Sequence, residues 1–202
     1  MGTASKIALG CGGLLVLALA VLGLTFVGSY NSLNGLSQAV EAQWGQVENV
    51  YQRRSDLVPN LVATVKGAAA FEKDTFTAVT EARAKVGQIN LGKAPSDPAA
   101  LARFQQAQEG LGSALSRLMV VVEKYPDLKA TQNFRDLQAQ LEGTENRITV
   151  ERMRFNQAAQ AFNTKRNNFP TVIIAGFFGD RFKDKVYFKA QAGAEQAPKV
   201  AF

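Results

Sequence analysis

The side chains best suited to chemistry in this 202-residue chain are arginines, carboxylates and side-chain amides that fall beside apolar stripes of helical spacing. These residues are Arg54, Asp56, Asn60, Glu81, Arg83, Glu145, Arg147, Arg152 and Asn156. Three interpretations are open: a satisfied network that fixes helix pairing, a solvated helix face, and a site for a partner or ligand. We favour the network, with Asp56 or Glu81 paired to one of these arginines across the bundle.

The residue types on which many enzymes depend are missing or misplaced. The chain has no histidine, which removes the usual general base at neutral pH and the commonest metal ligand. Its only cysteine, Cys11, lies in an apolar run, which excludes an intrachain disulfide and a zinc site built from cysteines. Carboxylates such as Glu72, Asp74 and Glu81 are more typical of solubilising charges than of metal ligands. We therefore predict a protein that is not an enzyme and uses no cofactor and no metal.

The charge pattern bears on the class of partner. The formal net charge is +6, and the basic residues are spread along the chain without forming a block. This spread argues against nucleic acid, because proteins that bind nucleic acid concentrate lysine and arginine in one patch. A mild positive balance favours an anionic lipid surface instead.

Residues 7–27 form an apolar run without a charged residue. As a helix this run is about 30 Å long, which matches the hydrocarbon core of a bilayer. A cleaved signal peptide is the alternative, but its apolar core usually has about 7–15 residues, and no Ala-x-Ala site follows here. A lipoprotein box at Cys11 is disfavoured because the apolar stretch follows the cysteine. We predict a short tail over residues 1–6 and an uncleaved transmembrane helix over residues 7–29.

The charges that flank this helix predict its orientation. Lys6 and the terminal amine precede the helix, whereas no lysine or arginine follows it until Arg53 and Arg54. The positive-inside rule then places the N-terminus in the cytoplasm and the remainder of the chain on the other side of the membrane.

After Tyr30 the apolar residues fall three and four positions apart, which indicates one face of a long helix. The stripe consists of Leu33, Leu36, Val40, Trp44, Val47, Tyr51, Val58, Leu61 and Val65. Pro59 lies inside it, and a proline there removes a hydrogen bond and clashes with the preceding turn. Because the stripe keeps its phase across Pro59, we favour one kinked helix over two separate helices.

Three more amphipathic segments follow, over about residues 72–89, from Pro98 to near Tyr125, and over about residues 131–167. Asp97 is a suitable N-cap, and Pro98 a suitable first residue, for the middle one. Four helices with short connections predict an all-α fold, in which the transmembrane helix is followed by an elongated up-down-up-down four-helix bundle over residues 30–169.

The C-terminal part departs from this pattern. Residues 170–188 break the helical period, and residues 190–202 are typical of a flexible tail. The apolar side chains of the segment 170–189 are Val172, Ile173, Ile174, Phe177, Phe178, Phe182, Tyr187 and Phe188. Two interpretations are open: the segment folds back over the end of the bundle and completes its core, or it contacts lipid or a second subunit.

Three stretches of sequence point to a known family. They are Arg53-Arg54-Ser55-Asp56-Leu57-Val58-Pro59-Asn60-Leu61 with its flanking residues from Tyr51 to Gly67, then Val79-Thr80-Glu81-Ala82-Arg83, and then Glu145-Asn146-Arg147-Ile148 continuing to Phe155-Asn156 and Phe169-Pro170. In these stretches the chain resembles the LemA family of bacterial membrane proteins, and the resemblance covers essentially its whole length. It implies a short tail, one membrane helix and a bundle of long helices, and it supplies no catalytic residue or cofactor site. Some relatives look like lipoproteins, but this chain lacks a proper lipid-attachment box.

Taken together, these features predict a single-pass protein of the bacterial inner membrane with a periplasmic bundle. We expect a structural or scaffolding role, with the lipid bilayer, further copies of the same chain and membrane proteins as partners. The alternative is a regulatory accessory subunit of a membrane protease or a signalling kinase.

Overall fold

A computed structural model describes residues 3–68, 72–89 and 91–189, and all the regular elements among them are helical. The elements are α1 (Thr3–Ala68), α2 (Lys73–Gly87), α3 (Pro98–Val122), α4 (Pro126–Lys129), α5 (Gln132–Asn167), α6 (Thr171–Phe178) and the 3-10 helix η1 (Gly179–Phe182). The tail predicted over residues 190–202 and the side chain of Cys11 lie outside the described part. The all-α prediction is confirmed.

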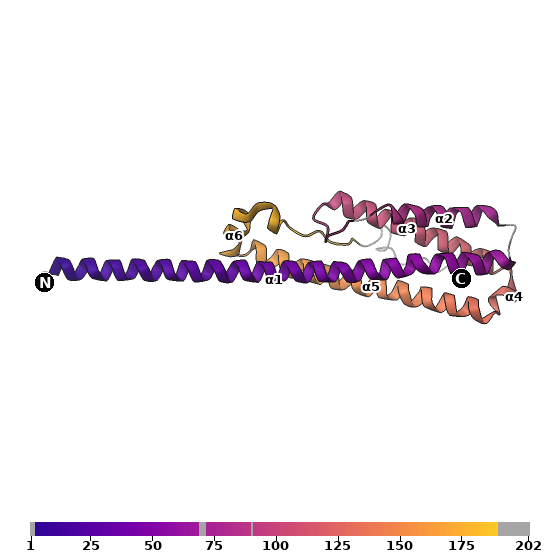
Figure 1. Cartoon of the computed structure of the whole chain (residues 1–202), viewed down its shortest axis with the longest axis horizontal. Helices are drawn as coiled ribbons and strands as arrows, with labels where there is room; N and C mark the ends of the chain where they lie inside the picture. Colours follow the sequence, from indigo (N-terminus) through magenta and orange to yellow (C-terminus); the bar gives the residue numbers. More distant parts are fainter. Residues whose placement is uncertain (1–2, 69–71, 90, 190–202) are drawn as a thin grey trace, which may run out of the picture.

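The first element, α1, is a single helix of 66 residues, about 100 Å long, that crosses most of the molecule (Figure 1). It includes both the apolar run and the first helix predicted for the bundle. Pro59 lies inside it without ending it, so the prediction of one helix over two is confirmed. By length and composition this is the one described helix that is apolar enough to cross a membrane.

The bundle is built from two antiparallel helix pairs. Helix α5 packs along α1, and α2 and α3 form a hairpin that covers only the half of this pair farther from the N-terminus (Figure 1). Chain direction alternates from α1 through α2 and α3 to α5, as predicted. The predicted N-cap of α3 is also present, because an Asp97 carboxylate oxygen accepts a hydrogen bond from the Ala99 backbone N–H at 2.9 Å.

Two apolar cores follow each other along the bundle. The distal core fills the space between the four helices, with Val58, Leu111, Leu118 and Phe134 among its most buried side chains. The proximal core lies nearer the apolar end of α1, and its centre is Trp44, which is 1% exposed.

The proximal core is completed by the C-terminal segment, whose structure corrects one prediction. Instead of breaking the helical pattern throughout, the chain forms α6 and η1 beside the end of α5 and the neighbouring part of α1 around Phe26 and Tyr30. Residues 183–189, here called the strap, have no regular secondary structure and run back along the bundle (Figure 1). Phe182 and Phe188 enter the proximal core and complete it, because α3 contributes only Leu101 and Phe104 and covers part of it.

Candidate functional site

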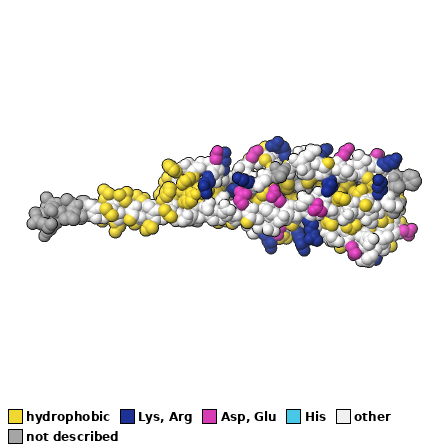
Figure 2. All heavy atoms as spheres, viewed as in Figure 1, with side chains coloured by type: hydrophobic (Ala, Val, Ile, Leu, Met, Phe, Trp, Pro, Cys, Tyr) yellow, Lys and Arg dark blue, Asp and Glu magenta, His cyan; other side chains and the backbone are white. Residues whose placement is uncertain are grey.

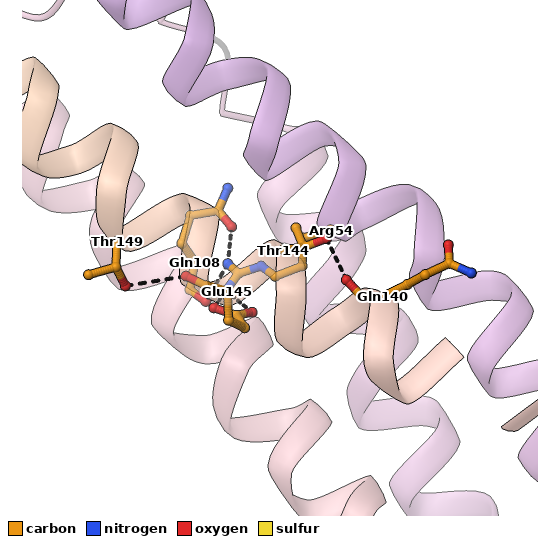
Figure 3. Close-up of polar contacts among 6 residues, drawn as sticks. All are labelled: Arg54, Gln108, Gln140, Thr144, Glu145 and Thr149. Atoms are coloured by element: carbon orange, nitrogen blue, oxygen red, sulfur yellow. Dashed lines mark hydrogen bonds and ion pairs between the residues drawn. The ribbon is translucent and has the colours of Figure 1, made fainter. Parts of the chain in front are cut away.

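The centre of the polar network is Arg54, which lies on the inner face of α1 and is 4% exposed. Its Nη1 donates to the two carboxylate oxygens of Glu145 on α5, at 2.9 and 3.2 Å (Figure 3). Its Nη2 donates to the backbone carbonyl of Gln108 on α3, at 3.0 Å, and to the side-chain carbonyl of the same residue. One guanidinium therefore ties three helices together between the two apolar cores.

The surroundings of Arg54 restrict it further. Its guanidinium carbon lies 5.1 Å from the centroid of the Tyr51 ring, close enough for a cation–π contact. On α5 the hydroxyls of Thr144 and Thr149 donate to backbone carbonyls one turn earlier, and so do not compete for the Glu145 carboxylate (Figure 3). The arrangement is suited to fixing helix register, because a buried charge with paired hydrogen bonds tolerates little displacement.

The predicted partners of the arginines are wrong in detail. Asp56 is exposed and accepts a hydrogen bond from Gln52 of its own helix at 2.8 Å, and Glu81 is also exposed. Neither carboxylate forms an ion pair within the described residues. The packing of α5 against α1 brings Glu145 opposite Arg54, and that register is not readable from the spacing of charges.

Of the other predicted residues of this region, one contacts a neighbouring helix and two are exposed to solvent. The Nε of Arg83 on α2 donates to the backbone carbonyl of Ser55 at 3.0 Å, which joins α2 to α1. Asn60 and Arg147 are exposed on their helices, as the solvated-face interpretation expects.

Asn156 and Arg152 belong to a second set of contacts, which holds the strap. The Asn156 side chain donates to the carbonyl of Phe188 at 3.0 Å and accepts from its backbone N–H at 2.8 Å. Two turns later on α5, Asn163 makes the same pair of bonds to Lys185, at 2.8 and 2.8 Å. Arg152 donates to the carbonyl of Lys189 at 2.9 Å. These side chains supply hydrogen bonds to the backbone of the extended strap, which does not pair with another strand in the described residues.

Three residues that hold the strap, Asn163, Lys185 and Glu41, are not predicted from the sequence. The Lys185 Nζ lies 3.2 Å from a carboxylate oxygen of Glu41 on α1, and Lys185 is 9% exposed. The other Glu41 oxygen accepts from the Ala94 backbone N–H at 2.8 Å, so this carboxylate joins the strap to the loop before α3. The only available signal was the two-turn spacing of the asparagines, which alone does not reveal a strap.

A groove of about 390 Å³ lies beside Arg54, between α1, α2 and α3. It is lined by Glu48, Asn49, Tyr51, Gln52, Ser55, Val86, Gly87, Ile89, Phe104 and Gln108. Glu48 is the only carboxylate among them, and no group of three or more metal-ligating side chains occurs in the described ranges. The lining thus offers hydrogen bonds and apolar contact.

Burial raises the pKa of Tyr51 above its ordinary value of 10.0, despite the opposing effect of the nearby Arg152 and Arg54 guanidinium groups. The folded chain therefore keeps this phenol proton at a pH where the unfolded chain loses it. The resulting contribution to stability is complete below about pH 10 and declines as the pH rises through the raised value.

We expect Tyr51→Phe to flatten the alkaline loss of stability, because the substituted ring has no proton to lose. The free energy of unfolding of both proteins, measured in urea at several pH values from about 8 to 11, would show the difference only in the upper part of this range. Equal slopes for the two proteins would contradict a raised Tyr51 pKa.

A second candidate site is the apolar surface at one end of the molecule. Over residues 12–27 the side chains of α1 are exposed, and Figure 2 shows this apolar surface extending to the neighbouring end of the bundle. The predicted C-terminal contact residues are divided: Ile174, Phe182 and Phe188 are buried, Phe178 is half-buried, and Val172, Ile173, Phe177 and Tyr187 are exposed. The segment thus completes the core with one face and leaves another uncovered.

Comparison with known proteins identifies the family of this chain. The chain matches the LemA family over residues 43–202. It is 30% identical over 196 residues to the magnetosome protein MamQ of Magnetospirillum gryphiswaldense, covering 86% of this chain and 71% of that protein. It is 27% identical over 197 residues to magnetosome protein MamQ 1 of Paramagnetospirillum magneticum, covering 89% and 72%. It is also 23% identical over 160 residues to protein LemA of Metamycoplasma hominis, covering 79% and 69%. The chain therefore belongs to the LemA family.

Proposed function

We propose that this protein is a membrane-anchored, non-enzymatic structural protein of the bacterial inner membrane, which associates with itself or organises partner proteins there. The observation that carries the proposal is the continuity of α1 from its exposed apolar part into the bundle. Because no loop separates the two parts, the anchor fixes the position and tilt of the bundle.

The apolar part of α1 supports a lipid anchor. Large side chains such as Leu14, Leu17 and Leu24 are between 62% and 75% exposed, and no other described segment covers residues 12–24. A helix that is apolar all round is stable when surrounded by hydrocarbon, where its backbone hydrogen bonds are satisfied internally.

Self-association is the form of scaffolding that an anchored rod favours. Anchored copies share a plane and an orientation, so each meets the others with the same side surface. Cross-linking in native membranes, followed by extraction in mild detergent, is the test. Homomeric rings or arrays would support the proposal, and an exclusively monomeric product would reject self-association. A stoichiometric protease or kinase in the extract would favour an accessory-subunit role instead.

We place the N-terminus in the cytoplasm and the bundle in the periplasm. Lys6 precedes the span, whereas Arg181 reaches its other end only through the folding of the bundle. The positive-inside rule counts charges close to the span along the sequence, so Arg181 does not oppose the orientation.

We expect Val120→Cys to react with a membrane-impermeant maleimide in intact spheroplasts. Val120 is 66% exposed on α3, so labelling there reports the side of the membrane on which the bundle lies. The unsubstituted chain, whose only thiol is Cys11 in the span, is the control. Labelling that appears only after lysis would place the bundle in the cytoplasm.

A further inference from the structure

The outward face of α6 is apolar and uncovered. Ile173 is 65% exposed and Phe177 is 80% exposed, one helical turn apart, and Phe169 just before α6 is 81% exposed. The opposite face is packed on the bundle through Thr171, Ile174 and Ala175, which are at most 6% exposed. Since α6 is held firmly by one face, its other face is presented in a fixed place and direction.

That place is the point where the apolar run of α1 ends. The ring of Phe178 lies 6.2 Å from the ring of Phe26 and 4.9 Å from that of Tyr30, measured between centroids. Helix α6 is therefore level with the last turn of the predicted span and not with the middle of the bundle (Figure 1).

The residues beside this face are those typical of a membrane–water boundary. The Arg181 guanidinium carbon lies 5.5 Å from the centroid of the Tyr30 ring, and its Nη2 donates to Asn34 at 3.4 Å. Aromatic rings and cations with apolar stems gather where acyl chains give way to headgroups, because one end of each is apolar and the other is wet. An apolar face at this level, beside the end of the span, is therefore in a position to contact lipid.

We propose that α6 is a second membrane contact, with Ile173 and Phe177 inserted among the lipids of the leaflet in which the span ends. Helix α6 has eight residues, about 12 Å, so it inserts into the boundary region and does not cross the bilayer. Two contacts side by side prevent the bundle from rotating about the span. This inference depends on the proposed anchoring of α1.

The test uses the full chain reconstituted into vesicles of brominated phosphatidylcholine, in which bromine quenches tryptophan fluorescence at short range. Phe177→Trp and Ile173→Trp are the reporters, and both sites are exposed, so neither substitution disturbs the core. Val120→Trp, on an exposed site far along α3, is the matched control, and Leu19→Trp reports the span itself. The native Trp44 is buried in the bundle and supplies the baseline measured on the unsubstituted chain.

We expect both α6 reporters to be quenched, more strongly by bromine near the headgroups than by bromine deep in the acyl chains. Leu19→Trp should be quenched most by deep bromine, and Val120→Trp should remain at the baseline. Quenching of Leu19→Trp without quenching of the α6 reporters would overturn this inference and leave the anchor intact. Absence of quenching at all sites would reject the anchor as well. A blue-shifted but unquenched Phe177→Trp would assign the face to a second copy of the chain.

Discussion

Arg54→Ala is expected to lower the free energy of unfolding by about 2–4 kcal/mol. The substitution removes both hydrogen bonds to Glu145, leaves the buried Gln108 side-chain carbonyl without its donor and opens a gap beside Tyr51. The expected loss of stability is smaller than for a fully buried ion pair, because the Glu145 side chain is 44% exposed and partly screened by water.

Arg53→Ala is the matched control for this experiment. Arg53 is the preceding residue of α1 and has the same side chain, but it is exposed. Its substitution should change stability by no more than about 0.5 kcal/mol. Unfolding in urea, followed by the helical circular dichroism of the full chain in detergent micelles, measures both. Equal midpoints for Arg54→Ala and Arg53→Ala would show that the three-helix connection does not stabilise the bundle.

Phe188→Ala is expected to release the strap and to cost about 3 kcal/mol. The Phe188 ring is 6% exposed, stacks on Trp44 at 6.1 Å and 19°, and meets Phe155 edge-on at 5.5 Å. Removing it leaves a cavity in the proximal core beside Trp44, on a side that α3 does not cover with its own residues Leu101 and Phe104. Because Trp44 is the only tryptophan, its emission should shift to the red and become accessible to acrylamide.

Tyr187→Ala separates this effect from a general loss of aromatic surface in the strap. Tyr187 is 41% exposed, and its hydroxyl accepts one hydrogen bond from Asn163 at 2.8 Å. The cost should be at most about 1 kcal/mol, without a shift of Trp44 emission. If Tyr187→Ala changed the Trp44 emission as much as Phe188→Ala, the stacked ring would not be what shields Trp44.

Arg54 and Phe188 make different connections in the same rod. Arg54 joins helices at the boundary between the two cores, whereas Phe188 seals the core nearest the apolar end of α1. In the proposed function both contribute to the stiffness with which the anchor holds the bundle, because each joins α1 to a segment distant in sequence.

Local patterns in the sequence determined most of the helices. The stripe from Leu33 to Val65 predicts a continuous helix across Pro59, because a helix that keeps its apolar face buried offsets the local cost of a proline. Asp97 before Pro98 fixes the start of α3 through the chemistry of a single turn. The charge-free run after Lys6 predicts the apolar part of α1 from its own length and composition, independently of the rest of the chain.

Only the tertiary structure determined which distant segments of the chain contact each other. The pairing of Arg54 with Glu145, in place of Asp56 or Glu81, depends on the register of α1 against α5, which is set by packing along the whole pair. The course of the strap depends on the part of the proximal core that α3 leaves uncovered. Helix α6 has one buried face because that face packs on the same core. Helical periodicity is a property of neighbours in sequence, whereas these contacts join residues far apart in the chain, whose closeness follows from the packing as a whole.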